Sequence, residues 1–127
     1  MKSIKILIDK HEIIVFLHKT ETADAVWKAC PFKSRIETWG KEIYFDTSIR
    51  VLKEKDAKQV LEKGEIAFWV EGHSIAIGFG PTPISERDEI KLVTKANIFG
   101  YSKYELSKLS NIGSGSLVKV ERNNNTI

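Results

Sequence analysis

Aromatic side chains on one face of strand-like segments are the strongest chemical signal in this sequence. Trp39 and Tyr44 lie in the run 35–46, and Trp69 lies in the run 65–80. Successive side chains of a strand point to opposite faces, so all three point away from the isoleucines and phenylalanines beside them. Such a face predicts either a solvated outer surface or the wall of a small-molecule or peptide site.

The run 35–46 predicts a β-hairpin. Gly40-Lys41 fits a two-residue type II′ turn, because glycine adopts the positive φ that the first turn position needs. Pairing outward from this turn gives a core face formed by Ile36, Thr38, Ile43 and Phe45. The opposite face is formed by Arg35, Glu37, Trp39, Glu42, Tyr44 and Asp46, with Arg35 directly opposite Asp46. The three carboxylates of that face are a weak signal for acid–base chemistry, because hairpin faces often carry charges.

The run 65–80 predicts a second hairpin, with a four-residue loop at 71–74. Its core face is formed by Ile66, Phe68, Val70, Ile75, Ile77 and Phe79. The other face has Trp69 among three small residues, Ala67, Ala76 and Gly78. Small side chains leave room above the sheet, so we expect a loop, a helix or a ligand to cover this surface. The proline-containing segment 81–88 either folds over it or forms the rim of a pocket.

No motif for catalysis, metal binding or cofactor binding stands out. The three histidines, His11, His18 and His73, are far apart and share no ligand spacing with Cys30, so we expect no metal site. Cys30 and Trp27 lie on the apolar stripe of a predicted helix, which favours a buried thiol and a core tryptophan. The chain also lacks a Gly-x-Ser-x-Gly elbow and a phosphate-binding loop. We therefore predict no catalytic residue and no cofactor.

Length and charge restrict the partners. The chain has 127 residues, 42% of them hydrophobic, which fits one globular domain at 1–121 followed by a flexible tail at 122–127. Lysine and arginine outnumber the acidic residues by 20 to 17, but the two signs are interleaved, so we expect no nucleic-acid partner. The chain has no apolar run as long as a membrane span and no signal-peptide pattern. With a single cysteine, these features predict a cytoplasmic protein without a membrane partner.

Short strands dominate the predicted elements. Besides the two hairpins, we expect strands or extended segments at 3–8, 12–17, 48–53, 89–93, 95–99 and 117–121. A helix begins at Thr20 or Thr22 and ends before Pro31, and two shorter helices are expected at 56–63 and 102–109. About eight strands with two or three short helices predict a mainly β domain. The short connections favour antiparallel pairing, and a closed barrel would remove the exposed edges.

Several strings resemble the cyclophilin-like domain family of small prokaryotic proteins, over residues 3–121. They are Pro31-Phe32, Thr38-Trp39-Gly40-x-Glu42-Ile43-Tyr44-Phe45, Gly64-Glu65-Ile66-Ala67-Phe68-Trp69 and Phe79-Gly80-x-Thr82-Pro83. The run 96–100 is also similar to the family's late strand. The resemblance implies a closed, cyclophilin-like β-barrel of about eight strands with short capping helices, and a function that is largely uncharacterised.

True cyclophilins are peptidyl-prolyl isomerases, with a site on the outer face of the barrel that uses an arginine and apolar residues. This chain departs from them because it has no Phe-His-Arg string and no Phe-x-Met-Gln string. Arg35 is the one arginine that the strand pattern places on the Trp39 face, and no motif gives it the catalytic role. We therefore do not expect isomerase activity, although it stays an alternative.

We predict a cyclophilin-like protein that binds a small molecule or peptide in an aromatic-lined groove on the barrel. The candidate ligand-binding residues are Arg35, Trp39, Tyr44, Trp69, Thr82 and Asn97. The aromatic residues would form the walls, Arg35 or Asn97 would give polar direction, and Thr82 lies in the segment expected at the rim. Two alternatives remain. One is a prolyl isomerase in which Arg35 polarises the prolyl carbonyl, and the other is a homodimer or interaction module that buries the same aromatic surface.

Overall fold

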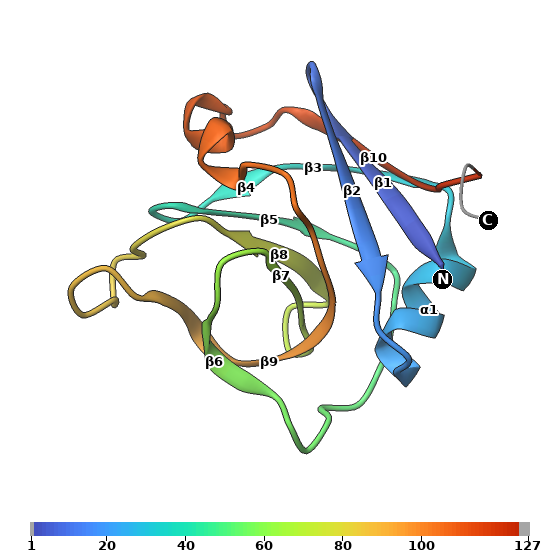
Figure 1. Cartoon of the computed structure of the whole chain (residues 1–127), viewed down its shortest axis with the longest axis horizontal. Coiled ribbons are helices and arrows are strands. Elements are labelled where there is room, and N and C mark those ends of the chain that lie inside the picture. Colours follow the sequence, from blue (N-terminus) through green and yellow to red (C-terminus); the bar gives the residue numbers. More distant parts are fainter. Residues whose placement is uncertain (1, 125–127) are drawn as a thin grey trace.

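A computed structural model describes residues 2–124 of the chain. Within that range it has ten strands, one α-helix and one 3₁₀-helix (Figure 1). The strands are β1 (Ser3–Ile8), β2 (His11–Leu17), β3 (Phe32–Arg35), β4 (Glu37–Thr38), β5 (Glu42–Asp46), β6 (Lys58–Leu61), β7 (Glu65–Trp69), β8 (Ser74–Gly78), β9 (Ile90–Tyr101) and β10 (Leu117–Arg122). The helices are α1 (Glu21–Ala29) and η1 (Leu106–Asn111).

The strands curl into a nearly closed antiparallel barrel (Figure 1). Their order is β3-β10-β1-β2-β9-β7-β8-β5-β4, and β6 pairs with β9 off this path. The two end strands, β3 and β4, are separated in the chain by Ile36 alone. The Ile36 N–H donates to the carbonyl of Ser116 at 2.9 Å, and its own carbonyl accepts from Gly115 N–H at 2.7 Å. The predicted mainly β barrel with short helices is confirmed, and its seam is closed by the chain itself.

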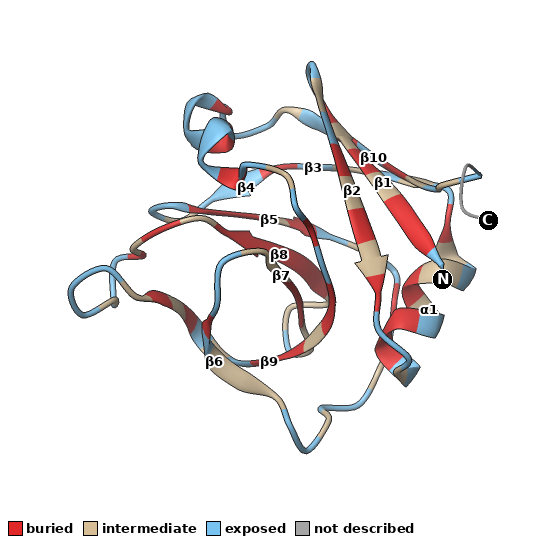
Figure 2. Ribbon diagram, viewed as in Figure 1, coloured by how far each residue is buried: buried red, intermediate tan, exposed pale blue. Residues whose placement is uncertain are grey.

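One large hydrophobic cluster fills the barrel. Figure 2 shows buried residues along the strands, interrupted by less buried ones. The alternation of apolar and polar residues decides which side chains enter it: in β1, for example, Ile4, Ile6 and Ile8 are buried while Lys5 and Leu7 are partly exposed. The largest fully buried side chains are Phe45, Phe68 and Phe99. Each contributes roughly 1.5–3 kcal/mol by leaving water.

Helix α1 packs against this cluster through Ala23 and Val26. Thr20 is its N-cap, because the Thr20 hydroxyl accepts a hydrogen bond from Ala23 N–H at 3.1 Å. Cys30 follows the last turn as a buried thiol, as predicted, and burial raises its pKa to about 11. Trp27 is partly buried and packs against the same cluster.

The helix expected at 56–63 is wrong, because this segment contains strand β6. The local capping pattern is used differently: Gln59 Nε2 donates to the carbonyl of Leu92 at 2.9 Å and so ties β6 to β9. Pairing with a strand thirty residues later outweighs the helical signal: Lys58, Val60 and Leu61 pair with β9, and Leu61 is buried. Gly64 ends the strand in a tight turn with φ of +89°.

Strand β9 replaces the two strands expected at 89–93 and 95–99. Its beginning pairs with β6, and its end pairs with β7 and then β2. The register with β7 shifts between Ile66 and Ala67, which marks a bulge at the place where the strand bends. Figure 1 shows β9 curving around one side of the barrel as a result.

The end of the chain differs in detail from the prediction. The helix expected at 102–109 is the 3₁₀-helix η1, which begins later, and Glu105 provides no side-chain cap. Arg122, placed in the predicted tail, belongs to β10. Asn123 N–H also donates to the carbonyl of Ser3 at 3.0 Å. Residues 125–127 of the predicted tail lie outside the described residues.

The first predicted hairpin is correct at its turn and wrong at its far end. Trp39 N–H donates to the carbonyl of Glu42 at 3.0 Å, and Gly40 has φ of +62°, as the two-residue turn requires. The expected pair of Arg35 and Asp46 does not form, because β4 is only two residues long and Arg35 belongs to β3, opposite Leu117 of β10. Thr38, expected in the core, is exposed.

The second predicted hairpin forms with a shifted register. Phe68 pairs with Ile75 and Ile66 with Ile77, so the loop is 70–73 instead of 71–74. Every expected partner changes by two positions, and an even shift leaves each side chain on its predicted face. Trp69 therefore still points away from the barrel core.

Asn97, at the middle of β9, holds two other segments in place. Its Oδ1 accepts from Glu54 N–H at 2.8 Å, and its Nδ2 donates to Thr22 Oγ1 at 3.0 Å and to the carbonyl of Leu52 at 2.9 Å. Asn97 is fully buried, so these bonds fix the long connection after β5 against α1 and β9.

We expect Asn97→Ala to lower the free energy of unfolding by about 2–4 kcal/mol, because it leaves several buried polar groups unpaired. Urea denaturation measures this loss. The matched control is Asn111→Ala at an exposed position of η1, for which we expect a change within about 0.5 kcal/mol. Equal effects of the two substitutions would contradict the structural role of Asn97.

Candidate functional site

A pocket of about 200 Å³ lies on the outer side of the two hairpins. Its lining residues are Trp39, Glu42, Tyr44, Trp69, Ala76, Leu92, Val93 and Thr94. They come from the turn after β4, from β5, β7 and β8, and from the first half of β9. The pocket is thus outside the barrel core, on the face that the aromatic pattern singled out.

Strand pairing brings the two hairpins into one surface. Strand β5 lies beside β8, with Glu42 opposite Gly78 and Tyr44 opposite Ala76. Ala76 is also opposite Ala67 of β7. A strip of small residues therefore runs across β7 and β8, with Glu42 and Tyr44 at one side of it.

The first half of β9 covers this strip. A second hydrophobic cluster, separate from the barrel core, is formed by Leu61, Ala67, Ala76, Ile90, Leu92 and Ala96. Gly78 makes this approach possible, because a Cβ on Gly78 would overlap Cγ2 of Ile90. The expected cover from 81–88 is not what covers these small residues. That loop begins beside the β4–β5 turn, where a Cβ on Gly40 would lie 2.9 Å from Cα of Thr82.

Trp69 is held in a fixed orientation at the end of β7. Its ring meets the Tyr44 ring edge to face, with 6.1 Å between ring centroids and 87° between planes. The backbone of Gly72 lies directly against the indole, since a Cβ on Gly72 would overlap the ring. Aromatic pairs of this geometry add about 0.5–1.5 kcal/mol beyond their buried area. Two walls of the pocket are therefore rigid before any ligand arrives.

Glu42 is the unusual residue of the pocket. It is only 6% exposed, and burial raises the pKa of its carboxyl from 4.5 to about 7. Its Oε1 has no hydrogen-bond partner, and neither has Nε1 of the Trp69 indole. Buried polar groups are nearly always paired, so an unpaired acceptor and an unpaired donor on two residues of one pocket mark it as the candidate place for a polar ligand.

The structure brings together three of the six sequence-predicted site residues, Trp39, Tyr44 and Trp69. Arg35 does not line the pocket, because its Nη1 donates to the carbonyl of Gly115 at 2.9 Å on the far side of the barrel seam. Thr82 is buried in its own loop, where its Oγ1 donates to the carbonyl of Lys91 at 2.5 Å. Asn97 is occupied by the bonds described above.

Sequence reasoning missed the remaining lining residues, and Glu42 above all. Glu42 was placed on the correct face, but Glu37 and Asp46 share that face and are exposed. The distinguishing signal is the position of Glu42 opposite Gly78, where another strand can cover it. Leu92, Val93 and Thr94 carry no pattern of their own, since their place depends on the bend of β9.

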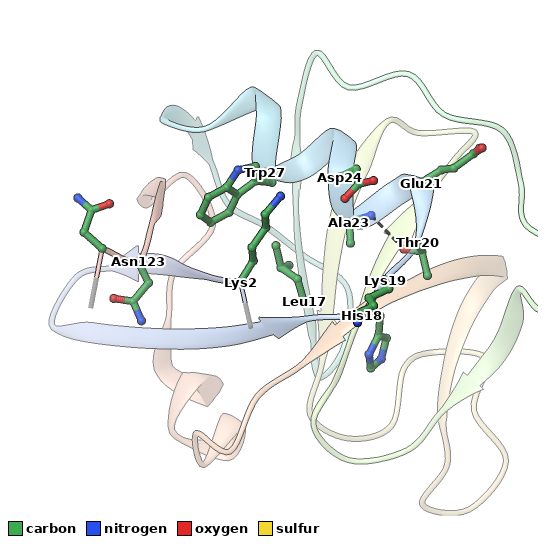
Figure 3. Close-up of a pocket in the computed structure, with 11 residues that line it drawn as sticks. Lys2, Leu17, His18, Lys19, Thr20, Glu21, Ala23, Asp24, Trp27 and Asn123 are labelled. Atoms are coloured by element: carbon green, nitrogen blue, oxygen red, sulfur yellow. Dashed lines mark hydrogen bonds between the residues drawn. The ribbon is translucent and has the colours of Figure 1, made fainter. Parts of the chain in front are cut away.

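A larger hollow of about 1130 Å³ lies beside α1 (Figure 3). Several of its side chains already have partners: Thr20 caps the helix, and Lys2 Nζ lies 5.2 Å from the centroid of the Trp27 ring. None of the unpartnered buried atoms found in residues 2–124 belongs to a residue that lines it. The smaller pocket is therefore the better candidate.

Within residues 2–124 no group of three or more histidine, cysteine or acidic side chains is placed to hold a metal ion. No helix in that part of the chain is long and apolar enough to cross a membrane. The chemistry available in the pocket is therefore that of an aromatic enclosure with one carboxyl and one indole N–H.

The raised pKa of Glu42 predicts a stability that falls as pH rises. Between the usual carboxyl value of 4.5 and about 7 the folded protein keeps a proton that the unfolded chain has lost, so the stabilising effect of protonation disappears over this range. Glu42→Gln, which stays neutral, should be more stable than the parent by up to roughly 3 kcal/mol at about pH 8 and nearly equal at about pH 4.

Urea denaturation at the two pH values measures this difference. Glu37→Gln, an exposed carboxylate on the other strand of the same hairpin, is the control and should change stability little at either pH. A Glu42→Gln protein that is less stable than the parent at high pH would show that the ionised carboxylate has a partner.

Among the solved structures that resemble this chain are one archaeal protein and McbB. The hypothetical protein AF2241 from Archaeoglobus fulgidus, known from a solution structure, is 34% identical, with a TM-score of 0.82 over 96% of this chain and 95% of its own. The structure of McbB in complex with tryptophan is 18% identical, with a TM-score of 0.59 over 98% of this chain and 46% of McbB. At that identity the likeness to McbB concerns the fold.

The family comparison covers nearly the whole described chain. No curated protein matches the sequence. The model of the family described as "Cyclophilin-like" matches residues 2–121, which include every strand except the last residue of β10. Together with the barrel and the archaeal structure, this match confirms the resemblance of the sequence strings: the chain belongs to the cyclophilin-like family.

Proposed function

We propose that this protein binds a small molecule with a flat apolar part in the pocket between Trp39, Tyr44 and Trp69. The observation that carries the proposal is the pair of unpartnered buried groups, Glu42 Oε1 and Trp69 Nε1, on two residues that line an aromatic pocket. Binding sites are mostly apolar, with a few polar groups that orient the ligand. This pocket has that composition, and these two atoms have no hydrogen-bond partner among residues 2–124.

The size of the pocket favours a small compound over a peptide. A volume of about 200 Å³ equals the space of roughly seven water molecules, which suits a single small ring system. The indole N–H of Trp69 offers a donor to such a ligand, and the Glu42 carboxyl offers an acceptor or, when protonated, a donor. McbB, solved with tryptophan bound, supports the proposal in that a protein of similar fold holds a small aromatic compound.

The prolyl isomerase alternative depended on Arg35. The pocket lining includes no arginine, and the Arg35 guanidinium is bonded to Gly115 in the loop before β10. No observation on the described residues favours this activity. The proposed function is therefore ligand binding without an assigned reaction.

Tryptophan fluorescence tests the proposal directly. The chain has three tryptophans, and Trp27 is outside the pocket, so a Trp27→Phe background leaves emission from Trp39 and Trp69 alone. We expect a library of indole-sized aromatic compounds, in neutral, cationic and anionic forms, to include compounds that change this emission saturably.

Trp39→Leu in otherwise wild-type protein should weaken the binding of such a compound by about five- to tenfold, measured by calorimetry, because one wall is lost. Tyr101→Leu removes an exposed aromatic residue outside the pocket and is the matched control. Absence of saturable binding across the library, or equal weakening by both substitutions, would refute the proposed site.

A further inference from the structure

The pocket has ionisable charge of one sign only. Among its lining residues Glu42 is the single group that carries charge near neutral pH, and no lysine, arginine or histidine accompanies it. An anionic ligand would meet a carboxyl with no balancing positive group. When Glu42 is ionised, the charge of the lining thus disfavours acids as ligands of this pocket.

The aromatic walls favour the same sign of ligand. Trp39, Tyr44 and Trp69 supply indole and phenol rings, whose faces are electron-rich and attract cations, most strongly for tryptophan. Tyr44 turns its ring at right angles to Trp69, so the two rings line the pocket as adjacent walls. Three aromatic residues and one carboxylate form the usual surroundings of a bound ammonium group.

The carboxyl of Glu42 has no cation of its own. None of the ion pairs found among residues 2–124 includes it. Lys41, its neighbour in the chain, lies with its side chain over Gly80. Oε1 is unpartnered and the residue is only 6% exposed, so an ionised Glu42 would be a costly buried charge. Two events avoid this cost: the carboxyl keeps a proton, or it pairs with a cation from outside.

We propose that the ligand of this pocket is a small organic cation, an ammonium group attached to a flat apolar part, with Glu42 as its counter-ion. The inference rests on the proposed function and names the chemical class of its ligand. The ammonium group lies against the Glu42 carboxylate and the aromatic faces, and the flat part fills the space beside Leu92. Binding exchanges the proton of Glu42 for the cation.

We assign the pH dependence of cation binding to Glu42, because the other charged residues nearby do not line the pocket. The other titratable or charged residues on the elements around it are Glu37 of β4, Lys41, Tyr44 and Asp46 at and in β5, Glu65 of β7, and Lys91 and Lys95 of β9. Of these, Tyr44 alone lines the pocket. Glu65 is paired with Lys58 at 2.7 Å, and Asp46 accepts from Ser74 Oγ at 3.0 Å.

Three probes with one ring and different charge test the inference: phenethylamine, 2-phenylethanol and 3-phenylpropionate. Calorimetry at about pH 8 should show the amine binding at least about tenfold more tightly than the alcohol, and no binding of the acid up to about 10 mM. The affinity for the amine should rise from about pH 5 to about pH 8, because Glu42, whose pKa is raised to about 7, must ionise. The affinity for the alcohol should not rise with pH.

Glu42→Gln keeps the shape of the side chain and should lower the affinity for the amine at about pH 8 to about that for the alcohol, and should abolish its rise with pH. Glu37→Gln is the control and should leave all three probes unchanged. Equal binding of amine and alcohol by the wild type, or equal weakening of both in Glu42→Gln, would overturn the cation inference and leave the proposed function intact. No saturable binding of any probe up to about 10 mM would overturn both.

Discussion

The bend of strand β9 is the constraint on which both the barrel and the pocket depend. One strand of twelve residues must provide backbone partners for β6 at its start and for β7 and β2 at its end. Its second half completes the barrel wall, with Phe99 in the core, and its first half returns over the outside of β7 and β8. The return needs small residues beneath it, which Ala67, Ala76 and Gly78 provide. The pocket forms at the end of this covered strip.

Much of the fold could be predicted, because local chemistry decides it. The turn at Gly40 and the alternation in both hairpins gave the correct faces, even where the register of β7 and β8 differed by two positions. The two largest failures share one cause, which is pairing between distant segments. The sequence 56–63 carries a helical capping signal, and nothing near it reveals that β9 will supply partners. Arg35 was assigned to the wrong neighbour because β10, eighty residues later, competes for β3.

The residues of the candidate site also fall into those that local periodicity predicts and those that depend on distant segments. Trp39, Tyr44 and Trp69 were recognised because strand periodicity alone turns them away from the core. Thr82 was predicted from its place in the segment expected at the rim and Asn97 from its polarity. Their hydrogen bonds to backbone and to Thr22 show that they maintain structure. Glu42 could not be distinguished from Glu37 and Asp46 in the sequence. The strand that lies over this part of the sheet is β9, which begins forty-eight residues after Glu42. The pKa of Glu42 is raised by burial in the tertiary structure. Sequence periodicity predicts which face a side chain is on, but it does not predict whether another segment buries that face.

The two hydrophobic clusters share strands but no buried side chains. Alternating positions of β7 and β8 thus serve separate purposes: Phe68 and Ile75 belong to the barrel core, and Ala67 and Ala76 belong to the outer cluster beside the pocket. Evolution can therefore vary the pocket at every second residue without altering the side chains that fill the barrel. A protein built in this way can acquire new ligand preferences at little cost to foldability, and one barrel can support a diverse set of binding activities.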